Sequence, residues 1–127
     1  MIINETFSGV TKLLGKTDIV FNTNLNGMKS ITSTELAALL QSGTAIQLID
    51  VREKHEHEAF NIGGELIPLS EITSHINEIG KEKPVIMYCR VGVRSQIAIQ
   101  RLQDKYPFKN LVNLAGGMEA WKKQFAL

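Results

Sequence analysis

Cysteine is nearly absent from this chain of 127 residues, since Cys89 is the only one. A single thiol excludes an internal disulfide framework and any zinc site built from several thiolates. The sequence also lacks a run of about 18 consecutive apolar residues, the length that a membrane-spanning helix needs. Its start lacks the basic residues, apolar run and small-residue cleavage site of a secretory signal. We therefore expect a cytoplasmic protein with no membrane partner, in which Cys89 serves packing or chemistry.

An excess of charge of one sign is missing as well. Fourteen Lys and Arg residues stand against thirteen Asp and Glu residues, which gives a formal net charge of +1. Nucleic-acid binding usually requires a broad positive field, so we expect no nucleic-acid partner and only local attraction of anions. Hydrophobic residues make up 43% of the chain and charged residues 21%. This composition is typical of one soluble folded domain.

From about Ser30 onward, short apolar runs alternate with amphipathic stretches, which predicts an α/β fold with a largely parallel sheet. Thr32 and Glu35 form a predicted capping box at the start of a helix that ends at Gly43. The further elements we expect are a strand at Ala45–Ile49, a polar helix within Asp50–Phe60, a strand at Glu65–Pro68, a helix from Ser70 to Gly80, a strand at Val85–Cys89, a helix at Ser95–Lys105, a strand at Leu111–Leu114 and a last helix that contains Trp121.

Residues 1–27 stand apart as an N-terminal extension, and residues 28–127 form the predicted domain. In the extension, the spacing of Phe7, Val10, Leu13 and Leu14 predicts one apolar face of a short helix that ends at Gly15. A basic polar face is missing, so we expect this helix to pack on the domain and not on a membrane.

The segment from Cys89 to Ser95 follows an apolar strand and opens a helix. This places it at the carboxyl end of the sheet, where α/β proteins bind ligands. If the segment curls around the sulfur, its N–H groups form an anion-binding nest, reinforced by the helix N-terminus and by Arg94. Gly92 fits a nest because one residue there must adopt a backbone conformation that a Cβ disfavours. These donors stabilise a thiolate over a thiol, which predicts a nucleophilic Cys89 beside an anionic substrate.

Three motifs between about Lys29 and Trp121 resemble those of the rhodanese family of sulfurtransferases. The loop Cys89-Arg90-Val91-Gly92-Val93-Arg94-Ser95 is similar to the family's Cys-Arg-x-Gly-x-Arg-Ser, Asp50-Val51-Arg52 to its Asp-x-Arg, and Gly116-Gly117-Met118-Glu119-Ala120-Trp121 to its Gly-Gly-x-x-Ala-Trp. One stretch departs from the family, because Phe60–Pro68 keeps two glycines but lacks the histidine and one proline of Gly-His-Ile-Pro-Gly-Ala.

The resemblance implies a central, mostly parallel five-stranded sheet flanked by helices on both faces. It also implies thiosulfate sulfurtransferase activity, in which Cys89 takes the outer sulfur of thiosulfate or a similar anionic donor and becomes a persulfide. The sulfur then passes to cyanide, a thiol or a sulfur-carrier protein. We expect no cofactor and no metal, and an acceptor outside the chain, because no second cysteine can resolve the persulfide.

Around the nucleophile Cys89, the residues expected to bind substrate are Arg90, Val91, Gly92, Val93, Arg94 and Ser95. Asp50 is interpreted first as a helix cap and Arg52 as a surface or bridging charge, so both have supporting roles. His55 and His57 are two positions apart, which on a helix directs them to different sides. We therefore expect a solvated face there and not a metal site.

Two other function classes share part of this pattern. Phosphatases and arsenate reductases also place a cysteine and an arginine around an anion-binding loop, but with five residues between them. Here four residues lie between Cys89 and Arg94, which disfavours that class. The other alternative is a non-catalytic rhodanese-like interaction module. Such modules typically lose the cysteine, which this chain keeps.

Overall fold

The computed structural model describes residues 4–7, 10–13 and 19–127. Its main sheet has six strands in the order β4-β5-β9-β8-β6-β7. These are β4 (Asn22–Thr23), β5 (Lys29–Ile31), β6 (Gln47–Asp50), β7 (Glu65–Leu66), β8 (Val85–Tyr88) and β9 (Leu111–Leu114). The pairs β5–β9, β9–β8, β8–β6 and β6–β7 are parallel, whereas β4 runs antiparallel to β5. The predicted mostly parallel sheet is confirmed, with β4 as an additional edge strand.

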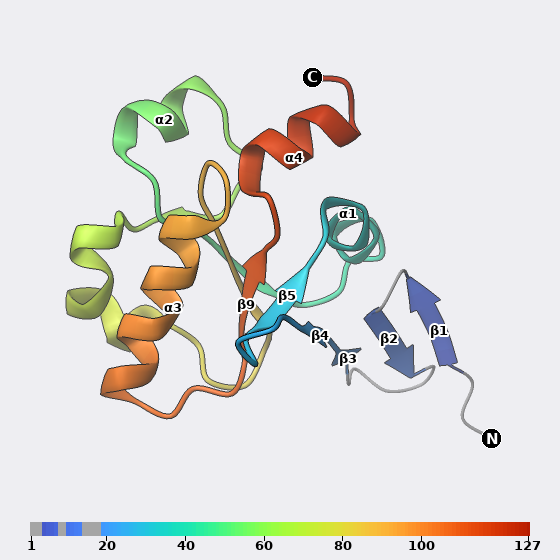
Figure 1. Ribbon diagram of the computed structural model, residues 1–127, viewed down its shortest axis with the longest axis horizontal. Coiled ribbons are helices and arrows are strands. Elements are labelled where there is room, and N and C mark those ends of the chain that lie inside the picture. The colour runs from blue at the N-terminus through green and yellow to red at the C-terminus, as the bar shows by residue number, and fades with distance from the viewer. Residues whose placement is uncertain (1–3, 8–9, 14–18) are drawn as a thin grey trace.

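Helices cover both faces of this sheet, so the fold has three layers (Figure 1). One face carries α1 (Ser33–Gln41) and α4 (Gly117–Gln124), and the other carries α3 (Val93–Lys105) and the 3₁₀ helix η1 (Leu69–Glu78). Strand β8 is buried throughout, with Val85 and Met87 in one apolar cluster and Ile86 and Tyr88 in the other. Its continuous apolar sequence is therefore explained by burial on both faces.

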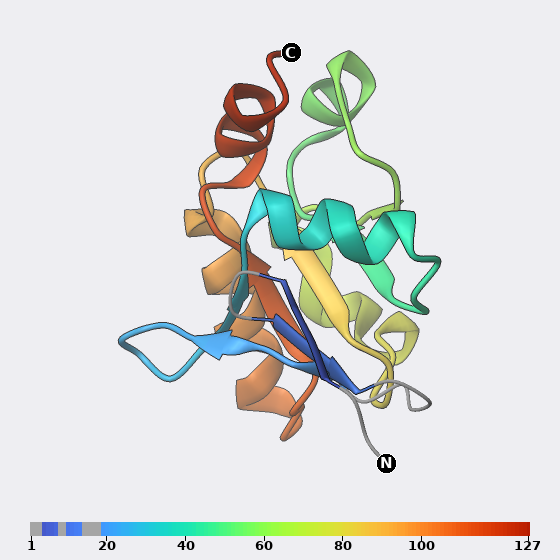
Figure 2. The ribbon, with the colours of Figure 1, turned by 90° about the vertical axis from the view of Figure 1, so that its right-hand side faces the viewer.

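The remaining helix, α2 (Lys54–Ala59), lies beyond the carboxyl edge of the sheet, next to α4 (Figure 2). It begins after Glu53, whose N–H donates to the Glu56 carboxylate at 3.1 Å. The predicted acidic cap at Asp50 is wrong, because Asp50 is the last residue of β6. The chain needs three further residues to turn from the strand into the helix, so Glu53 takes the N-cap position.

Local sequence signals account for the other helix boundaries. At α1 the predicted capping box is present: Thr32 accepts from the Glu35 N–H at 3.2 Å, and Glu35 accepts from the Thr32 N–H at 2.7 Å. Helix α3 begins at Val93, two residues before the predicted start, so Arg94 lies in its first turn. The segment predicted as a helix from Ser70 is a 3₁₀ helix, and His75 has non-helical backbone angles within it.

The short helix predicted around Phe7 is wrong. Strands β1 (Asn4–Phe7), β2 (Val10–Leu13) and β3 (Ile19–Val20) form a separate antiparallel sheet there. The β-branched residues Thr6, Val10 and Thr11 favour extended backbone, and this preference outweighs the helical spacing of the apolar residues. Leu14 and Gly15 lie outside the described residues. The boundary expected after residue 27 falls in the β4–β5 hairpin, so the extension supplies β4 to the main sheet.

None of the helices within residues 19–127 is long and apolar enough to cross a membrane.

The turn that leads into β7 depends on one glycine with no room for a side chain. Gly64 has φ +84°, and a Cβ there would lie 2.2 Å from the backbone oxygen of Leu48. Burial raises the pKa of Tyr88 to about 12. Its hydroxyl therefore stays protonated and donates to the Gly63 oxygen at 2.9 Å. The turn is thus fixed from two sides, although the family's histidine and proline are missing.

We predict that Gly64→Ala destabilises the protein more than Gly63→Ala does. Both positions have positive φ, which costs a residue with a Cβ about 1–2 kcal/mol. A Cβ at Gly63 meets open space, whereas at Gly64 it overlaps backbone, which adds about 1–3 kcal/mol. Urea unfolding of the two variants measures the difference, and equal losses of unfolding free energy would contradict the close approach.

Candidate active site

Cys89 follows the buried strand β8 at the carboxyl end of the sheet, and only 1% of its surface is exposed. Its sulfur accepts the backbone N–H of Gly92 at 3.1 Å and that of Ser95 at 3.4 Å. Two amide dipoles therefore point at the sulfur from the segment of residues 89–95, called here the cysteine loop. Because water has little access to the sulfur, these dipoles supply the stabilisation that a thiolate would otherwise obtain from solvent.

Gly92 is the residue that allows the loop to curl. It has φ +94° and stands directly before α3, as the N-cap. A Cβ at this position would lie 3.2 Å from the Gly116 nitrogen and 3.4 Å from the Leu114 oxygen. Both the left-handed backbone and the tight packing therefore require glycine. The resulting turn aims the N-terminus of α3, the positive end of its dipole, at the loop.

A second layer of contacts fixes Ser95 beneath the sulfur. The Ser95 hydroxyl lies 3.4 Å from the Cys89 sulfur and donates to the side-chain oxygen of Asn113 on β9. Ser95 is 0% exposed and Asn113 is 3% exposed. Asn113 was not among the predicted site residues. The signal that marks it is a lone amide side chain in an otherwise apolar, buried strand.

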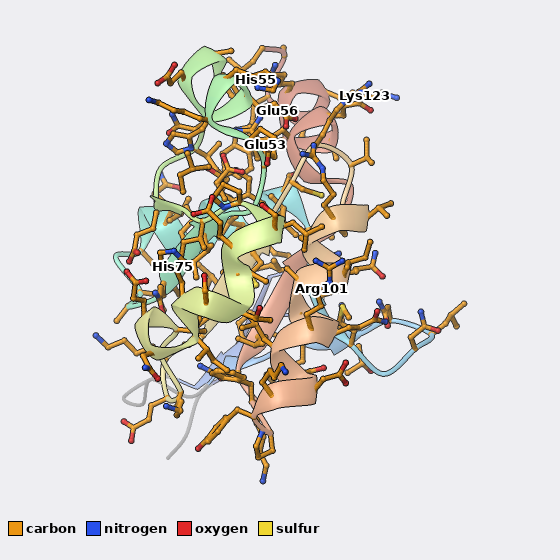
Figure 3. The ribbon with its side chains drawn as sticks, turned by 90° about the vertical axis from the view of Figure 1, so that its left-hand side faces the viewer. Glu53, His55, Glu56, His75, Arg101 and Lys123 are labelled. Carbon is orange, nitrogen blue, oxygen red and sulfur yellow. The ribbon has the colours of Figure 1, made fainter. Side chains whose placement is uncertain are left out.

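Arg94, which was expected to reinforce the cysteine loop, has its guanidinium paired with a carboxylate of α2. Its guanidinium donates two hydrogen bonds of 2.8 Å to the two carboxylate oxygens of Glu56 on α2. Figure 3 shows Glu56 on α2, at the end of the molecule that also carries α4. The bonds from Arg94 lower the pKa of Glu56 from 4.5 to about 2, so the pair stays ionised at neutral pH. Arg94 therefore ties the first turn of α3 to α2.

Glu56 was missed in the sequence because α2 contains several acidic residues and no spacing distinguishes this one. Both side chains are partly buried, with exposed fractions of 33% for Arg94 and 20% for Glu56. The bidentate geometry separates this pair from the exposed pair of Lys54 and Glu58, 3.8 Å apart on the same helix.

Asp50 and Arg52 form a buried ion pair beside the site. Arg52 Nη2 lies 2.8 Å from the Asp50 carboxylate and donates a second hydrogen bond of 2.6 Å to the Phe60 oxygen. His57 Nδ1 lies 2.9 Å from the same carboxylate. The bridging interpretation of Arg52 is thus the observed one, and a surface position is wrong, since only 5% of the residue is exposed. Together these contacts connect the end of β6 with the C-terminal half of α2 and the residue that follows it.

The Gly-Gly motif of the C-terminal segment packs directly against the cysteine loop. The N–H groups of Met118 and Glu119, in the first turn of α4, donate to the backbone oxygens of Cys89 at 2.9 Å and Arg90 at 3.0 Å. A Cβ on Gly117 would lie only 2.4 Å from the Cys89 oxygen. The backbone of α4 can therefore approach the loop only because position 117 has no side chain.

A pocket of about 260 Å³ adjoins the loop between α2 and α4. Its lining residues are Arg52, Glu56, Ala59, Phe60, Arg90, Met118, Glu119 and Lys122. Arg90 lies at the rim, with its side chain 67% exposed and 2.8 Å from Glu119. Val91 and Val93 are also exposed, at 45% and 57%. The loop thus presents a mixed charged and apolar rim above a buried sulfur.

A larger pocket, of about 450 Å³, lies at the amino ends of β5 and β9 and holds no predicted site residue. Trp121 packs against the apolar cluster of α1 and α4, as expected. Within the described ranges, no group of three or more His, Cys, Asp or Glu side chains is arranged to hold a metal ion.

Comparison with known proteins gives relatives that share most of this chain. The uncharacterized protein YqhL of Bacillus subtilis is 42% identical over 95 residues, which cover 74% of this chain and 72% of YqhL. The thiosulfate sulfurtransferase GlpE of Coxiella burnetii is 35% identical over 78 residues, or 61% of this chain and 72% of GlpE. The probable adenylyltransferase/sulfurtransferase MoeZ of Mycobacterium tuberculosis is 39% identical over 98 residues, but the chain spans only 25% of its length.

Among solved structures, the human single-domain sulfurtransferase TSTD1 superposes with a TM-score of 0.66 at 28% sequence identity. The match covers 75% of this chain and 96% of TSTD1. The sequence pattern of the family described as "Rhodanese-like domain" matches residues 32–124, which include the Asp-x-Arg, cysteine-loop and Gly-Gly motifs. This chain therefore belongs to the rhodanese-like domain family.

Proposed function

We propose that this protein is a sulfurtransferase that carries sulfur as a persulfide on Cys89. The observation that carries the proposal is the pair of N–H groups, from Gly92 and Ser95, that point at the Cys89 sulfur. Such donors stabilise negative charge on the sulfur in both forms of a transfer cycle, the thiolate and the persulfide anion. The names of the relatives GlpE and TSTD1, both sulfurtransferases, support the same assignment.

The proposed reaction has two steps, and thiosulfate or a similar anion is the donor. In the first step, the Cys89 thiolate attacks the outer sulfur of thiosulfate. A new S–S bond forms, the S–S bond of thiosulfate breaks, and sulfite leaves with the bonding electron pair. In the second step, a nucleophilic acceptor attacks the outer sulfur of the persulfide and releases the thiolate. Cyanide, for example, leaves as thiocyanate.

The acceptor in this scheme is an external molecule, because Cys89 is the only cysteine in the chain. An acceptor thiol or a sulfur-carrier protein has to reach the sulfur across the rim of the cysteine loop. The exposed side chains of Val91 and Val93 form part of this rim. We propose that residues 90–95 together bind the donor, with Asp50 and Arg52 in a supporting role through α2.

The geometry gives less support to the phosphatase alternative. A cysteine-dependent phosphatase uses its loop arginine to bind the phosphoryl oxygens, whereas both outer nitrogens of Arg94 donate to Glu56. The non-catalytic module is disfavoured because the loop retains its cysteine and two N–H groups directed at the sulfur.

Incubation with thiosulfate is expected to load one sulfur atom onto the protein. Intact-mass spectrometry should show a gain of about 32 Da, the mass of one sulfur on a cysteine persulfide. Cys89→Ser is the control and should show no gain. Subsequent cyanide should return the wild-type mass and release thiocyanate. No mass gain with any sulfur donor would favour the interaction module over the enzyme.

Removal of the Arg94 side chain should slow sulfur transfer without unfolding the domain. We expect Arg94→Ala to raise the activation free energy by roughly 2 to 4 kcal/mol, because the first turn of α3 loses its tie to α2. Glu56→Gln should act in the same direction with a smaller effect, and Glu58→Gln, on the exposed part of α2, is the matched control. The measurements are kcat/KM for thiosulfate and the circular dichroism spectrum.

Two results would contradict this role of Arg94. Full activity of Arg94→Ala would show that the cysteine loop does not need the ion pair between Arg94 and Glu56. An increase of activity in Glu56→Gln would show that Arg94 acts directly on the donor once it is released from the carboxylate.

Aryl phosphates should not be substrates. The loop is one residue shorter than that of phosphatases, and the Arg94 guanidinium is held by Glu56. A p-nitrophenyl phosphate assay on the wild type and Cys89→Ser is therefore expected to give equal, background rates. Turnover that depends on Cys89 would overturn the sulfurtransferase assignment.

A further inference from the structure

The charged side chains that line the pocket between α2 and α4 are mostly paired. Arg52 is bound to Asp50, Glu56 to Arg94, and Arg90 to Glu119. In each pair an N–O distance is 2.8 Å. The carboxylate partner of each cation offsets most of its long-range field, which leaves short-range contacts with a bound donor as its contribution.

Lys122 differs from the other cations of the pocket lining because it has no ion-pair partner among residues 20–127. Among residues 20–127, whose side chains the structure describes, no carboxylate lies within ion-pair distance of its ammonium group. The group lies instead over the Phe60 ring, 4.6 Å from its centroid. A contact with a ring face orients a cation without cancelling its charge. Lys122 therefore leaves a net positive charge at the mouth of the pocket.

The position of Lys122 on α4 connects it with the cysteine loop. Met118, whose N–H donates to the Cys89 oxygen, stands four residues earlier and lines the same pocket. Residues four apart on a helix share a face, so Lys122 lies one turn above the contact with the loop. The next residue, Lys123, labelled in Figure 3, is also exposed but is not part of the pocket lining.

We propose that Lys122 is a specificity-determining residue that attracts anionic sulfur donors into the pocket beside Cys89. The inference rests on the proposed sulfurtransferase function. Lys122 is exposed, so solvent and salt weaken its attraction at a distance, but it still acts on an anion that enters the pocket beside it. Lys122 acts on donor binding and not on the bond-breaking step, so its removal should change KM and leave kcat nearly unchanged. The change in KM should be larger for a donor with more negative charge.

Two donors with the same reacting sulfur but different charge test this role. Thiosulfate is a dianion, and benzenethiosulfonate is a monoanion that transfers its outer sulfur and leaves as a sulfinate. For Lys122→Met we expect KM for thiosulfate to rise about three- to tenfold, a smaller rise for benzenethiosulfonate, and kcat within about twofold of the wild type. Lys123→Met is the matched control and should leave both KM values unchanged. Lys122→Arg should restore most of the affinity because it keeps the charge.

The dependence of KM on ionic strength is an independent test of the role of Lys122. The wild-type KM for thiosulfate should rise with ionic strength, and this dependence should be weaker in Lys122→Met. The inference is overturned if the variants at 122 and 123 behave alike, if kcat falls while KM stays constant, or if both donors are affected equally. Failure of the proposed function is a separate result: the wild-type protein would then gain no sulfur mass from either donor.

Discussion

The packing of two backbone amide donors against the buried sulfur of Cys89 is the physical constraint on which this end of the molecule depends. Only 1% of Cys89 is exposed, so solvent contributes little to the stability of a thiolate. The N–H groups of Gly92 and Ser95 replace it. Their direction requires the left-handed backbone at Gly92, and that backbone packs against residues 114 and 116. Strand β8, helix α3 and the start of α4 therefore meet around the cysteine loop, and the amides of α4 hold the backbone oxygens of Cys89 and Arg90.

Arg52 and Arg94 connect helix α2 and its flanking residues to the rest of the fold. Arg52 connects Asp50 at the end of β6 with the backbone at Phe60, and Arg94 connects α3 with Glu56. Both pairs involve α2 or the segments next to it. A six-residue helix has little stability of its own, since short helices depend on tertiary contacts. The two pairs thus hold α2 as one wall of the pocket and leave Lys122 on α4 to supply the unbalanced charge.

The sequence was sufficient to predict the parallel sheet and the cysteine loop, because both leave strong local signals. Strand β8 is a continuous apolar run that ends at the only cysteine, and Gly92 marks the turn. The Gly-Gly motif was recognised by resemblance, but its physical reason, the contact of Gly117 with the Cys89 oxygen, appears only in three dimensions. The same holds for Glu56 and Asn113, whose partners lie 38 and 18 residues away in the chain.

The errors have physical causes too. Asp50 resembles a helix cap in sequence, but it is the last residue of β6, and its carboxylate contacts Arg52 and His57, two and seven residues further on. The N-terminal segment has apolar residues at helical spacing, yet its β-branched residues pair as strands. In both places a short-range pattern was compatible with two structures, and the contacts that decided between them are visible only in three dimensions.

In a persulfide on Cys89, the burial of the cysteine would determine which of the two sulfur atoms an acceptor molecule can reach. An S–S bond is about 2 Å long, so the terminal atom of a persulfide on Cys89 would extend outward while the atom bonded to Cβ stays enclosed by the loop. An acceptor thiol that attacked the enclosed atom would break the persulfide S–S bond, expel the terminal sulfur as hydrosulfide and leave a mixed disulfide on Cys89. The surrounding backbone would shield that atom, so the burial that leaves the terminal sulfur as the reachable one would also prevent this side reaction.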